Sequence, residues 1–128
     1  MVVRITGDCP LIDSKLVDDV VAEFLSSNVD YFSNISPPTY PDGLDVEVFS
    51  WRTLDVANLK AESSSDREHV TPYIRTSSHF SHGNMLYEDD LSHLRWTLDE
   101  PEDFQLIEKI FSHFSPEIFF NWKDILEY

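Results

Sequence analysis

The spacing of apolar residues along the chain predicts strands and helices in alternation. Residues 2–6 form a short apolar run, which is typical of a buried or half-buried strand. Asp13 is placed to cap a helix whose apolar side chains fall on one face, namely Leu16, Val17, Val20, Val21, Phe24 and Leu25. Residues 29–32 predict another strand. Residues 44–49 alternate apolar and acidic side chains, which predicts a strand with two different faces.

The second half of the chain continues the alternation. A helix is expected over residues 51–62, a break at the serines of 63–65, and another helix that Asp66 caps. Residues 84–87 and 94–97 predict strands. Pro101 suits the first position of a further helix, and a short helix is expected over 121–126. Strands that alternate with helices in one compact length predict an α/β sheet fold, with residues 1–128 as part of a single domain.

Net charge and cysteine content limit the partners and the cellular location that can be expected for this chain. The chain has 9 basic and 24 acidic residues, giving a net charge of −15. Nucleic-acid backbones and anionic membranes are bound by clustered Lys and Arg, so neither is expected as a partner. Cys9 is the only cysteine, which excludes an internal disulfide and fits a cytoplasmic location. The sequence shows no apolar run of about 18 residues and no signal-peptide pattern at its start.

Two carboxylates stand where strands are expected to end. Asp8 follows Gly7 after the first strand, and a glycine there lets a ligand approach the backbone. Asp99 follows residues 94–97 and precedes a helix. One Mg²⁺ commonly takes one or two protein carboxylates, so the pair is a candidate metal site. The alternative is that Asp8 caps a turn and Asp99 caps the helix.

Two further groups of polar residues are candidates for substrate binding. The loop and strand that hold Tyr40, Asp42, Gly43, Asp45 and Glu47 present polar groups that suit sugar hydroxyls, although the residues alone favour an exposed strand face beside a tight turn. Arg67 and His69 sit in what we expect to be the opening of a helix. Arg67 suits a bidentate clamp on a carboxylate or phosphate and His69 suits acid–base chemistry, while a surface ion-pair group is the alternative.

Four segments in order resemble one family. They are residues 4–13 (RITGDCPLID), 40–48 (YPDGLDVEV), 67–74 (REHVTPYI) and 95–103 (RWTLDEPED). The sequence is similar to the cytidylyltransferase-like family of spore-coat polysaccharide biosynthesis protein F, whose relatives activate sialic acids and Kdo. The resemblance implies a partial nucleotide-diphospho-sugar transferase fold, Rossmann-like, with a mixed sheet flanked by helices and its first strands missing.

The resemblance also implies chemistry. In the relatives a sugar hydroxyl attacks the α-phosphorus of CTP and pyrophosphate leaves, with Mg²⁺ neutralising charge. Asp8 and Asp99 match metal ligands, and Gly7 lies beside the nucleotide. The segment from Tyr40 to Glu47 and the pair Arg67 and His69 match the sugar side. CTP and a sugar or sugar acid are therefore the expected substrates.

One departure from the family affects activity. Its members begin with a Gly-rich loop that ends in Arg and Lys and cradles the CTP phosphates, whereas this chain has only Gly7, Gly43 and Gly83, none in such a loop. We expect weak CTP binding by the chain alone. We also expect self-association, or completion by a separate N-terminal portion, at the edge of the first strand. The alternatives are a non-catalytic interaction module and a metal-dependent glycosyltransferase of related fold.

Overall fold

A four-stranded mixed sheet lies at the centre of the computed structural model, which describes all 128 residues. The strand order is β1-β3-β2-β4. The strands are β1 (Val2–Arg4), β2 (Tyr31–Ser33), β3 (Glu47–Phe49) and β4 (His82–Asn84). Strand β3 is antiparallel to β1 and β2, and β4 is parallel to β2. The expected α/β fold with a mixed sheet and flanking helices is confirmed.

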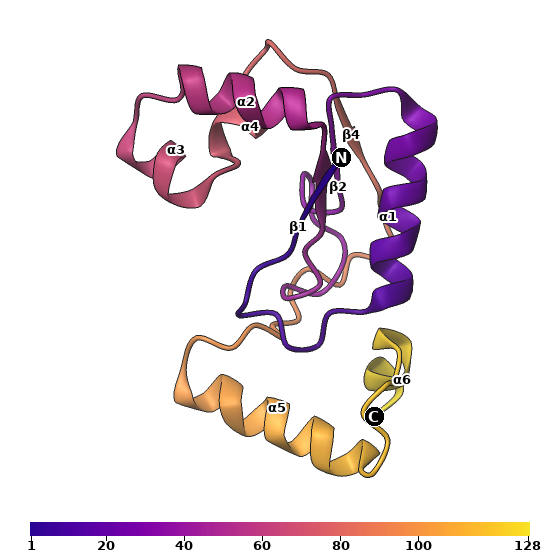
Figure 1. Ribbon diagram of the computed structural model, residues 1–128. Helices are drawn as coiled ribbons and strands as arrows, with labels where there is room; N and C mark the ends of the chain where they lie inside the picture. The colour runs from indigo at the N-terminus through magenta and orange to yellow at the C-terminus, as the bar shows by residue number, and fades with distance from the viewer.

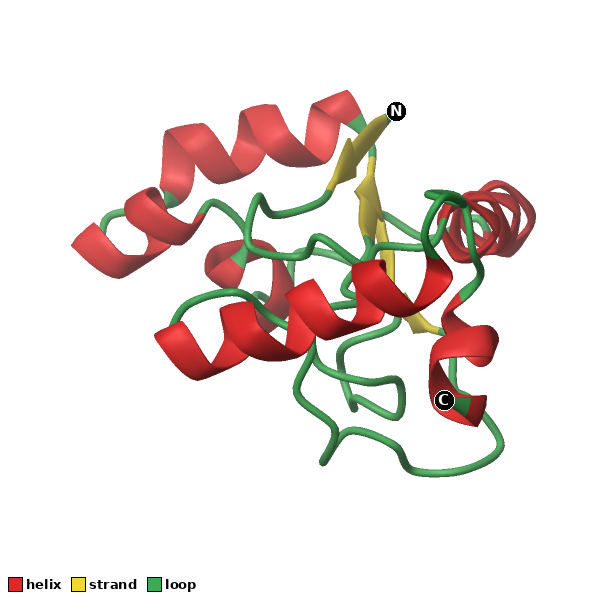
Figure 2. Ribbon diagram, turned by 90° about the horizontal axis from the view of Figure 1, so that it is seen from below, coloured by secondary structure: helices red, strands yellow, loops and turns green.

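Six helices surround the sheet in three groups (Figure 1). Helix α1 (Ser14–Ser27) runs alongside the strands and packs on β2 and β3. Three helices gather near one end of the strands, namely α2 (Trp51–Lys60), α3 (Ser64–His69) and α4 (Pro72–Thr76). Helices α5 (Pro101–Phe114) and α6 (Trp122–Glu127) lie at the other end. Figure 2 shows α5 and α6 from below.

Asp13 joins α1 to α6. Its Oδ1 accepts hydrogen bonds from the backbone N–H groups of Lys15 and Leu16, at 2.7 and 3.1 Å, which is the N-cap that the sequence predicts. Its Oδ2 accepts from the backbone N–H of Trp122 at 2.9 Å. Asp13 is only 5% exposed. The carboxylate is therefore fully used in holding the start of α1 against the last helix.

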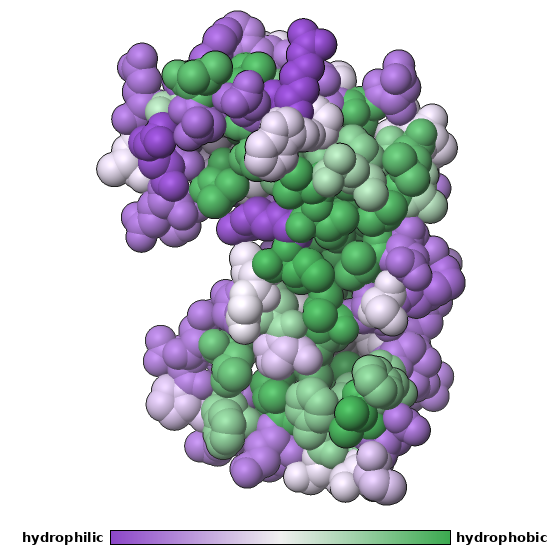
Figure 3. Space-filling view, viewed as in Figure 1, coloured by the Kyte–Doolittle hydropathy of each residue, from purple (hydrophilic) through white to green (hydrophobic).

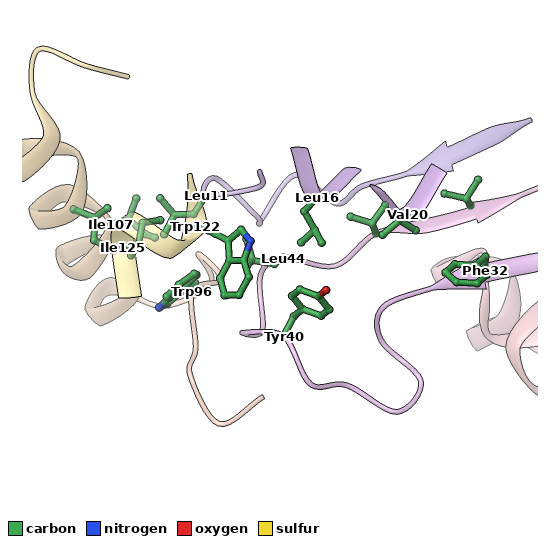
Figure 4. Close-up of a cluster of buried hydrophobic side chains, with 13 residues drawn as sticks. Leu11, Leu16, Val20, Phe32, Tyr40, Leu44, Trp96, Ile107, Trp122 and Ile125 are labelled. Carbon is green, nitrogen blue, oxygen red and sulfur yellow. The ribbon is translucent and has the colours of Figure 1, made fainter. Parts of the chain in front are cut away.

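The main hydrophobic core runs from the sheet to α5 and α6 (Figure 4). Val20 on α1 and Phe32 on β2 lie at the sheet end, and Trp96, Ile107 and Ile125 at the other. A smaller core beneath α2 and α4 contains Tyr31, Phe49, Ala57 and Ile74. All the apolar positions predicted on α1 lie in or pack against the main core except Leu25, which is 68% exposed, as expected for an amphipathic helix.

Several predicted boundaries are wrong. Residues 94–97 form no strand, because only Arg95 makes an isolated bridge, with Asp42. The strand expected over 84–87 is β4, which ends at Asn84. Ser63, not Asp66, caps α3, since its hydroxyl accepts from the Asp66 N–H at 3.0 Å. Glu100, not Asp99, is the N-cap of α5, and it forms a capping box with Asp103.

Arg67 and His69 end a helix instead of opening one. Helix α3 stops at His69 because Val70 has φ 69° and ψ −53°. The Thr71 N–H donates to the His69 carbonyl at 2.8 Å, so Val70 is the centre of a classic γ-turn. A β-branched residue with positive φ is strained. The turn separates α3 from α4 and directs Thr71 into the interior, where it is 1% exposed.

The surface is hollowed between the part that carries α2, α3 and α4 and the part that carries α5 (Figure 3). Strand β1 forms one edge of the sheet, and Val3 and Ile5 are 37% and 43% exposed there. The edge therefore presents unpaired backbone groups together with apolar side chains. No helix combines the length and the apolar character that a membrane span needs.

Candidate active site

Three loops from separate parts of the sequence meet at one rim of the sheet. The Leu98 N–H donates to the Asp8 carbonyl at 2.8 Å. The Asp42 N–H donates to the Leu94 carbonyl at 2.9 Å, and the Trp96 N–H donates back to the Asp42 carbonyl at 2.7 Å. These backbone bonds place the loop after β1, the loop before β3 and the segment before α5 side by side (Figure 1). Three of the four motifs recognised in the sequence thus converge.

Asp8 lies in a tight turn that begins at Thr6. The Cys9 N–H donates to the Thr6 carbonyl at 3.3 Å, and the Thr6 hydroxyl and Cys9 thiol are 3.1 Å apart. A hydrogen bond from the Thr6 side chain lowers the pKa of Asp8, which keeps it ionised. Burial raises the pKa of Cys9, and the side chain is 6% exposed, so this thiol packs in the interior. Gly7 leaves open space beside the carboxylate, since a Cβ there would meet nothing within 4 Å.

Gly43 makes the crossing of the loops possible. Its φ is +110°, and a Cβ at this position would lie 2.7 Å from the Trp96 carbonyl carbon and 2.9 Å from the Thr97 nitrogen. Both contacts are with backbone, which cannot rotate away as a side chain can. The glycine therefore allows the loop before β3 to approach the segment that leads to Asp99.

We expect Gly43→Ala to lower the free energy of unfolding by about 2–3 kcal/mol, from backbone strain and from overpacking against Trp96. Gly7→Ala is the matched control, and the absence of any neighbour there predicts a change within about 0.5 kcal/mol. Urea denaturation of both variants measures the difference. Equal losses for the two alanines would show that the loop crossing does not depend on Gly43.

Arg95 organises the segment that carries Asp99. Its guanidinium donates to Asp99 Oδ2 at 2.8 Å and to both oxygens of Asp103, at 3.1 and 2.9 Å, and it lies 3.8 Å from Asp42 Oδ2. The bond from Arg95 holds the pKa of Asp103 far below its usual range. Oδ1 of Asp99 makes no hydrogen bond within the protein. Asp99 is thus oriented by one oxygen and exposed at the other.

Asp45 is a half-buried carboxylate with like charges around it. Burial raises its pKa to about 6, with further contributions from Asp42, Glu47 and Asp8. Asn34 fixes the backbone on both sides of it: Asn34 Nδ2 donates to the Leu44 carbonyl at 2.8 Å, and the Val46 N–H donates to Asn34 Oδ1 at 2.9 Å. Asp8, Asp42 and Asp45 therefore form one acidic rim whose geometry is set by the fold.

The raised pKa predicts a pH-dependent stability. Ionised Asp45 is unfavourable in the folded state, so its contribution is fully present below the unfolded pKa, near 3.8, and is lost as the pH rises through about 6. Discounted for partial exposure, Asp45→Asn is expected to stabilise the protein by about 1–2 kcal/mol at pH 8 and by nothing below about pH 4. Urea melts across this range test it, with exposed Asp55→Asn on α2 as control. A gain independent of pH would contradict the assignment.

The alternation of residues 44–49 suggested that Glu47 lies on an exposed strand face. In the structure its side chain is buried, and the residue is only 2% exposed. Its Oε1 accepts from Arg4 at 2.5 Å and from the Thr71 hydroxyl at 3.1 Å, and its Oε2 accepts from the Tyr31 hydroxyl at 2.5 Å. Burial and the Glu47 charge together raise the pKa of Tyr31 well above its usual range. All the contacts of Glu47 are internal, so it holds the strands that carry the rim.

Of the other predicted substrate residues, Arg67 and His69 lie away from the three loops, whereas Tyr40 lies in the loop before β3 and lines the cleft that also contains Asp42 and Asp45. The Tyr40 ring is 8% exposed and packs edge-to-face on Trp122, with centroids 5.6 Å apart. Arg67 donates to the Asn58 and Ala61 carbonyls at 3.2 and 3.3 Å, near the end of α2. His69 is exposed at the end of α3, which stands apart from the rim (Figure 1). A substrate role for these three residues stays a prediction.

Sequence reasoning missed three residues at or near the rim. Asn34 clamps Asp45, Thr97 is buried at the loop crossing with a hydroxyl that has no partner, and Arg75 lines the adjoining cleft. Nothing in the local pattern marks Asn34 or Thr97, because their burial depends on distant loops. Arg75 directly follows the third motif. A basic residue at that place in so acidic a chain could have marked it as a candidate site residue.

Comparison with known proteins agrees with the convergence of the motifs. The sequence profile described as Cytidylyltransferase matches residues 1–119. The chain belongs to the cytidylyltransferase family. The spore-coat resemblance is confirmed with it, since the spore coat polysaccharide biosynthesis protein SpsF of Bacillus subtilis is 27% identical over 115 residues, covering 87% of this chain and 47% of SpsF. Because the chain belongs to this family, the alternative of a metal-dependent glycosyltransferase is not supported.

A second sequence relative and one solved structure also resemble this member of the cytidylyltransferase family. The uncharacterised protein MJ1063 of Methanocaldococcus jannaschii is 35% identical over 119 residues, covering 89% of this chain and 47% of MJ1063. A solved cytidylyltransferase of Leptospira borgpetersenii serovar Hardjo-bovis superposes with a TM-score of 0.91 at 33% identity, over 98% of this chain and 53% of that one. The chain thus spans about half the length of the relatives that it matches.

The carboxylates of Asp8 and Asp99 supply some, but not all, of the oxygen ligands that a divalent ion such as Mg²⁺ needs. No three or more His, Cys, Asp or Glu side chains group closely enough to form a protein cage for a metal. Mg²⁺ is instead commonly bound by one or two carboxylates, with water and substrate phosphates completing its shell. Ionised Asp8 and the free oxygen of Asp99 are donors of that kind on adjoining segments. Their chemistry therefore fits Mg²⁺ that arrives with a nucleotide.

Proposed function

We propose that this chain supplies the metal-binding and acceptor-binding part of an enzyme that transfers CMP from CTP to a sugar or sugar acid for polysaccharide biosynthesis. The observation that carries the proposal is the backbone bond from Leu98 to Asp8, which sets the Asp8 and Asp99 segments against each other. Catalysis of such a transfer is mainly positioning and charge neutralisation.

In this proposal each group at the rim has one task. Asp8 and Asp99 hold Mg²⁺, which offsets the charge of the phosphates when bound. Gly7 leaves room for the nucleotide beside Asp8. Asp42 and Asp45 accept hydrogen bonds from acceptor hydroxyls, and Gly43 keeps their loop against Trp96. An acceptor hydroxyl attacks the α-phosphorus of CTP and pyrophosphate leaves.

The CTP phosphates need cationic and backbone donors that these residues do not offer. Phosphates bind to Gly-rich loops and helix N-termini with Lys or Arg nearby. The three glycines of this chain stand singly, and Arg4 and Arg95 are committed to carboxylates. We therefore propose that polypeptide beyond these 128 residues contributes the phosphate loop, and that it covers the β1 edge.

Pyrophosphate release tests the proposal. CTP, Mg²⁺ and a panel of sugars and sugar acids are supplied to the chain alone, and to the chain preceded by the region of the Leptospira cytidylyltransferase that it does not match. We expect turnover from the extended protein and little from the chain alone. If the extended protein is folded and binds CTP but transfers CMP to no acceptor, a non-catalytic role replaces this one.

A further inference from the structure

A second cleft, of about 430 Å³, lies between the start of α1 and the start of α6, and we call it the aromatic cleft. Its walls carry Tyr40, Tyr87 and Trp122, whose rings pack on one another with centroids between 4.9 and 5.6 Å apart. It shares only Tyr40 with the cleft that contains Asp42 and Asp45. Pockets of a few hundred Å³ with convergent polar groups on apolar walls are typical of small-molecule sites. The aromatic cleft is therefore a candidate binding site outside the acidic rim.

Two of these aromatic side chains are deeply buried, yet their polar atoms have no partner in the protein. Tyr40 and Trp122 are 8% and 6% exposed, and the hydroxyl of one and the indole N–H of the other make no hydrogen bond. Thr97 Oγ1 is the only fully buried side-chain polar atom without a partner, so these two groups reach the surface. In Figure 4 both lie on the side of their ring that faces Leu16 of α1, which lines the aromatic cleft. Buried tyrosine and tryptophan usually find a partner for the O–H or N–H, so this arrangement favours a ligand site.

The other free groups of the aromatic cleft are hydrogen-bond donors as well. Lys123 Nζ lies 5.6 and 5.7 Å from the ring centroids of Tyr87 and Trp122 and forms no ion pair. The Tyr87 hydroxyl makes no hydrogen bond within the protein. Burial, followed by the charges of Asp19 and Tyr87, raises the pKa of Tyr40, so its hydroxyl stays protonated. Four unpaired donors therefore line one cleft, and one of them carries a positive charge.

The remaining polar side chains of the cleft are already engaged. The Asp13 carboxylate accepts three backbone N–H groups, and Lys15 pairs with Asp19. Asn121 caps α6 and donates to Asp124. The unpaired donors therefore decide the chemistry of the cleft. They suit a ligand that offers hydrogen-bond acceptors and carries negative charge.

The fold holds these donors in place from separate segments. The backbone N–H of Trp122 donates to Asp13 at 2.9 Å, which ties the start of α6 to α1. The backbone N–H of Tyr87 donates to Thr39 Oγ1 at 2.8 Å, which ties the loop after β4 to the loop before β3. The three rings then pack on one another. Groups that are fixed in this way favour a preformed site.

We propose that the aromatic cleft binds a phosphorylated sugar, with the phosphate on Lys123 and the Trp122 indole N–H and the sugar oxygens on the hydroxyls of Tyr40 and Tyr87. A phosphomonoester has three strong acceptor oxygens and a charge of about −1.5 to −2 at pH 7, which suits several convergent donors and one lysine. A nucleotide suits the cleft less well, because the buried rings of Tyr40 and Trp122 leave a nucleobase no free face to stack on. The site goes beyond the proposed function and does not depend on CMP transfer.

The test is binding of phosphosugars to the 128-residue chain and to the extended protein, followed by the indole N–H signal of Trp122 in NMR spectra. The indole of Trp51 on α2 is an internal control, since Trp51 does not line the cleft. The probes are glucose 1-phosphate, glucose 6-phosphate and mannose 6-phosphate, each beside its neutral parent sugar. The variants are Lys123→Gln and Tyr87→Phe. Lys109→Gln on α5 is the matched control, because Lys109 lies outside the cleft.

We expect at least one phosphosugar to bind about 10- to 100-fold more tightly than its parent sugar, because hydrogen bonds to charged groups are the strong ones. It should shift the indole signal of Trp122 and leave that of Trp51 in place. Lys123→Gln should remove the preference for the phosphosugar, whereas Lys109→Gln should keep it. Tyr87→Phe deletes one hydroxyl and should weaken binding about 3- to 10-fold. Thermal melting verifies that each variant is folded. Equal binding of sugar and phosphosugar, or no shift at Trp122, would overturn the proposal.

Further arms distinguish the source of the phosphate and the state of the cleft in a longer protein. If inorganic phosphate binds as tightly as every phosphosugar, the sugar makes no contact and the assignment is wrong. If CMP binds more tightly than all phosphosugars, the cleft is a nucleotide site and the assignment is equally wrong. Binding that disappears in the extended protein would mean that other polypeptide fills the cleft, which also refutes it. Binding that persists there supports the site, whether or not the extended protein transfers CMP.

Discussion

Replacing Glu47 with alanine is expected to lower the free energy of unfolding by about 3–5 kcal/mol, as for other broken buried ion pairs. The variant leaves Arg4, the Tyr31 hydroxyl and the Thr71 hydroxyl without their shared acceptor. Tyr31 and Thr71 are 2% and 1% exposed, so water cannot replace the lost bonds without rearrangement. Urea denaturation measures the loss.

Two variants sharpen the interpretation of that loss. Glu62→Ala removes an exposed carboxylate just beyond α2 and is expected to change stability by less than about 0.5 kcal/mol. A double-mutant cycle of Glu47→Ala with Tyr31→Phe isolates the coupling between the two side chains. A loss below about 1 kcal/mol for Glu47→Ala would mean that the network does not hold β1, β2 and β3 together.

Replacing Asp8 with asparagine is expected to lower CMP transfer by the extended protein about 10²- to 10³-fold, the scale of several kcal/mol of lost charge stabilisation. Stability should change little, because Asp8 makes only local hydrogen bonds. Asp99→Asn is expected to have a similar effect, and the double variant little more, since residues that act as a unit are not additive. Initial rates of pyrophosphate release give the ratios.

Controls separate metal binding from loss of structure. Asp18→Asn on α1 removes an exposed carboxylate remote from the rim and should leave the rate unchanged. Asp103→Asn weakens the ion pair that holds Arg95, the arginine that also binds Asp99, without removing a proposed metal ligand. If Asp103→Asn costs as much activity as Asp99→Asn, then Asp99 acts only by holding Arg95, and its role as a ligand is refuted.

Local pattern was enough for the elements whose caps and apolar faces lie within a few residues of one another. The apolar face and the Asp13 cap predicted α1, and Pro101 predicted the start of α5. Shared motifs predicted that Asp8 and the segment of Asp99 belong to one site, and the backbone bond from Leu98 to Asp8 joins these segments. For α1 and α5 the signal lies within a few residues of the feature that it predicts, whereas the link between Asp8 and Asp99 came from motifs shared with a family.

What sequence reasoning missed depends on contacts between distant residues. Alternation placed Glu47 on a solvent face, yet Arg4 and Thr71 come from 43 and 24 positions away to cover it. The end of α3 is set by the positive φ of Val70, a conformation that valine rarely adopts. Arg75 became a candidate only when the fold placed it in the cleft that contains Asp42 and Asp45.

The most direct test of the account adds Mn²⁺, a paramagnetic substitute for Mg²⁺, at substoichiometric concentration together with CTP to the extended protein, and observes the side-chain carboxyl carbons of the aspartates by NMR. The account predicts that the signals of Asp8 and Asp99 broaden together and first, and that Asp8→Asn abolishes the broadening at Asp99. If the two signals broaden independently, or if other carboxylates broaden before them, these two residues share no ion and the proposed active site is wrong.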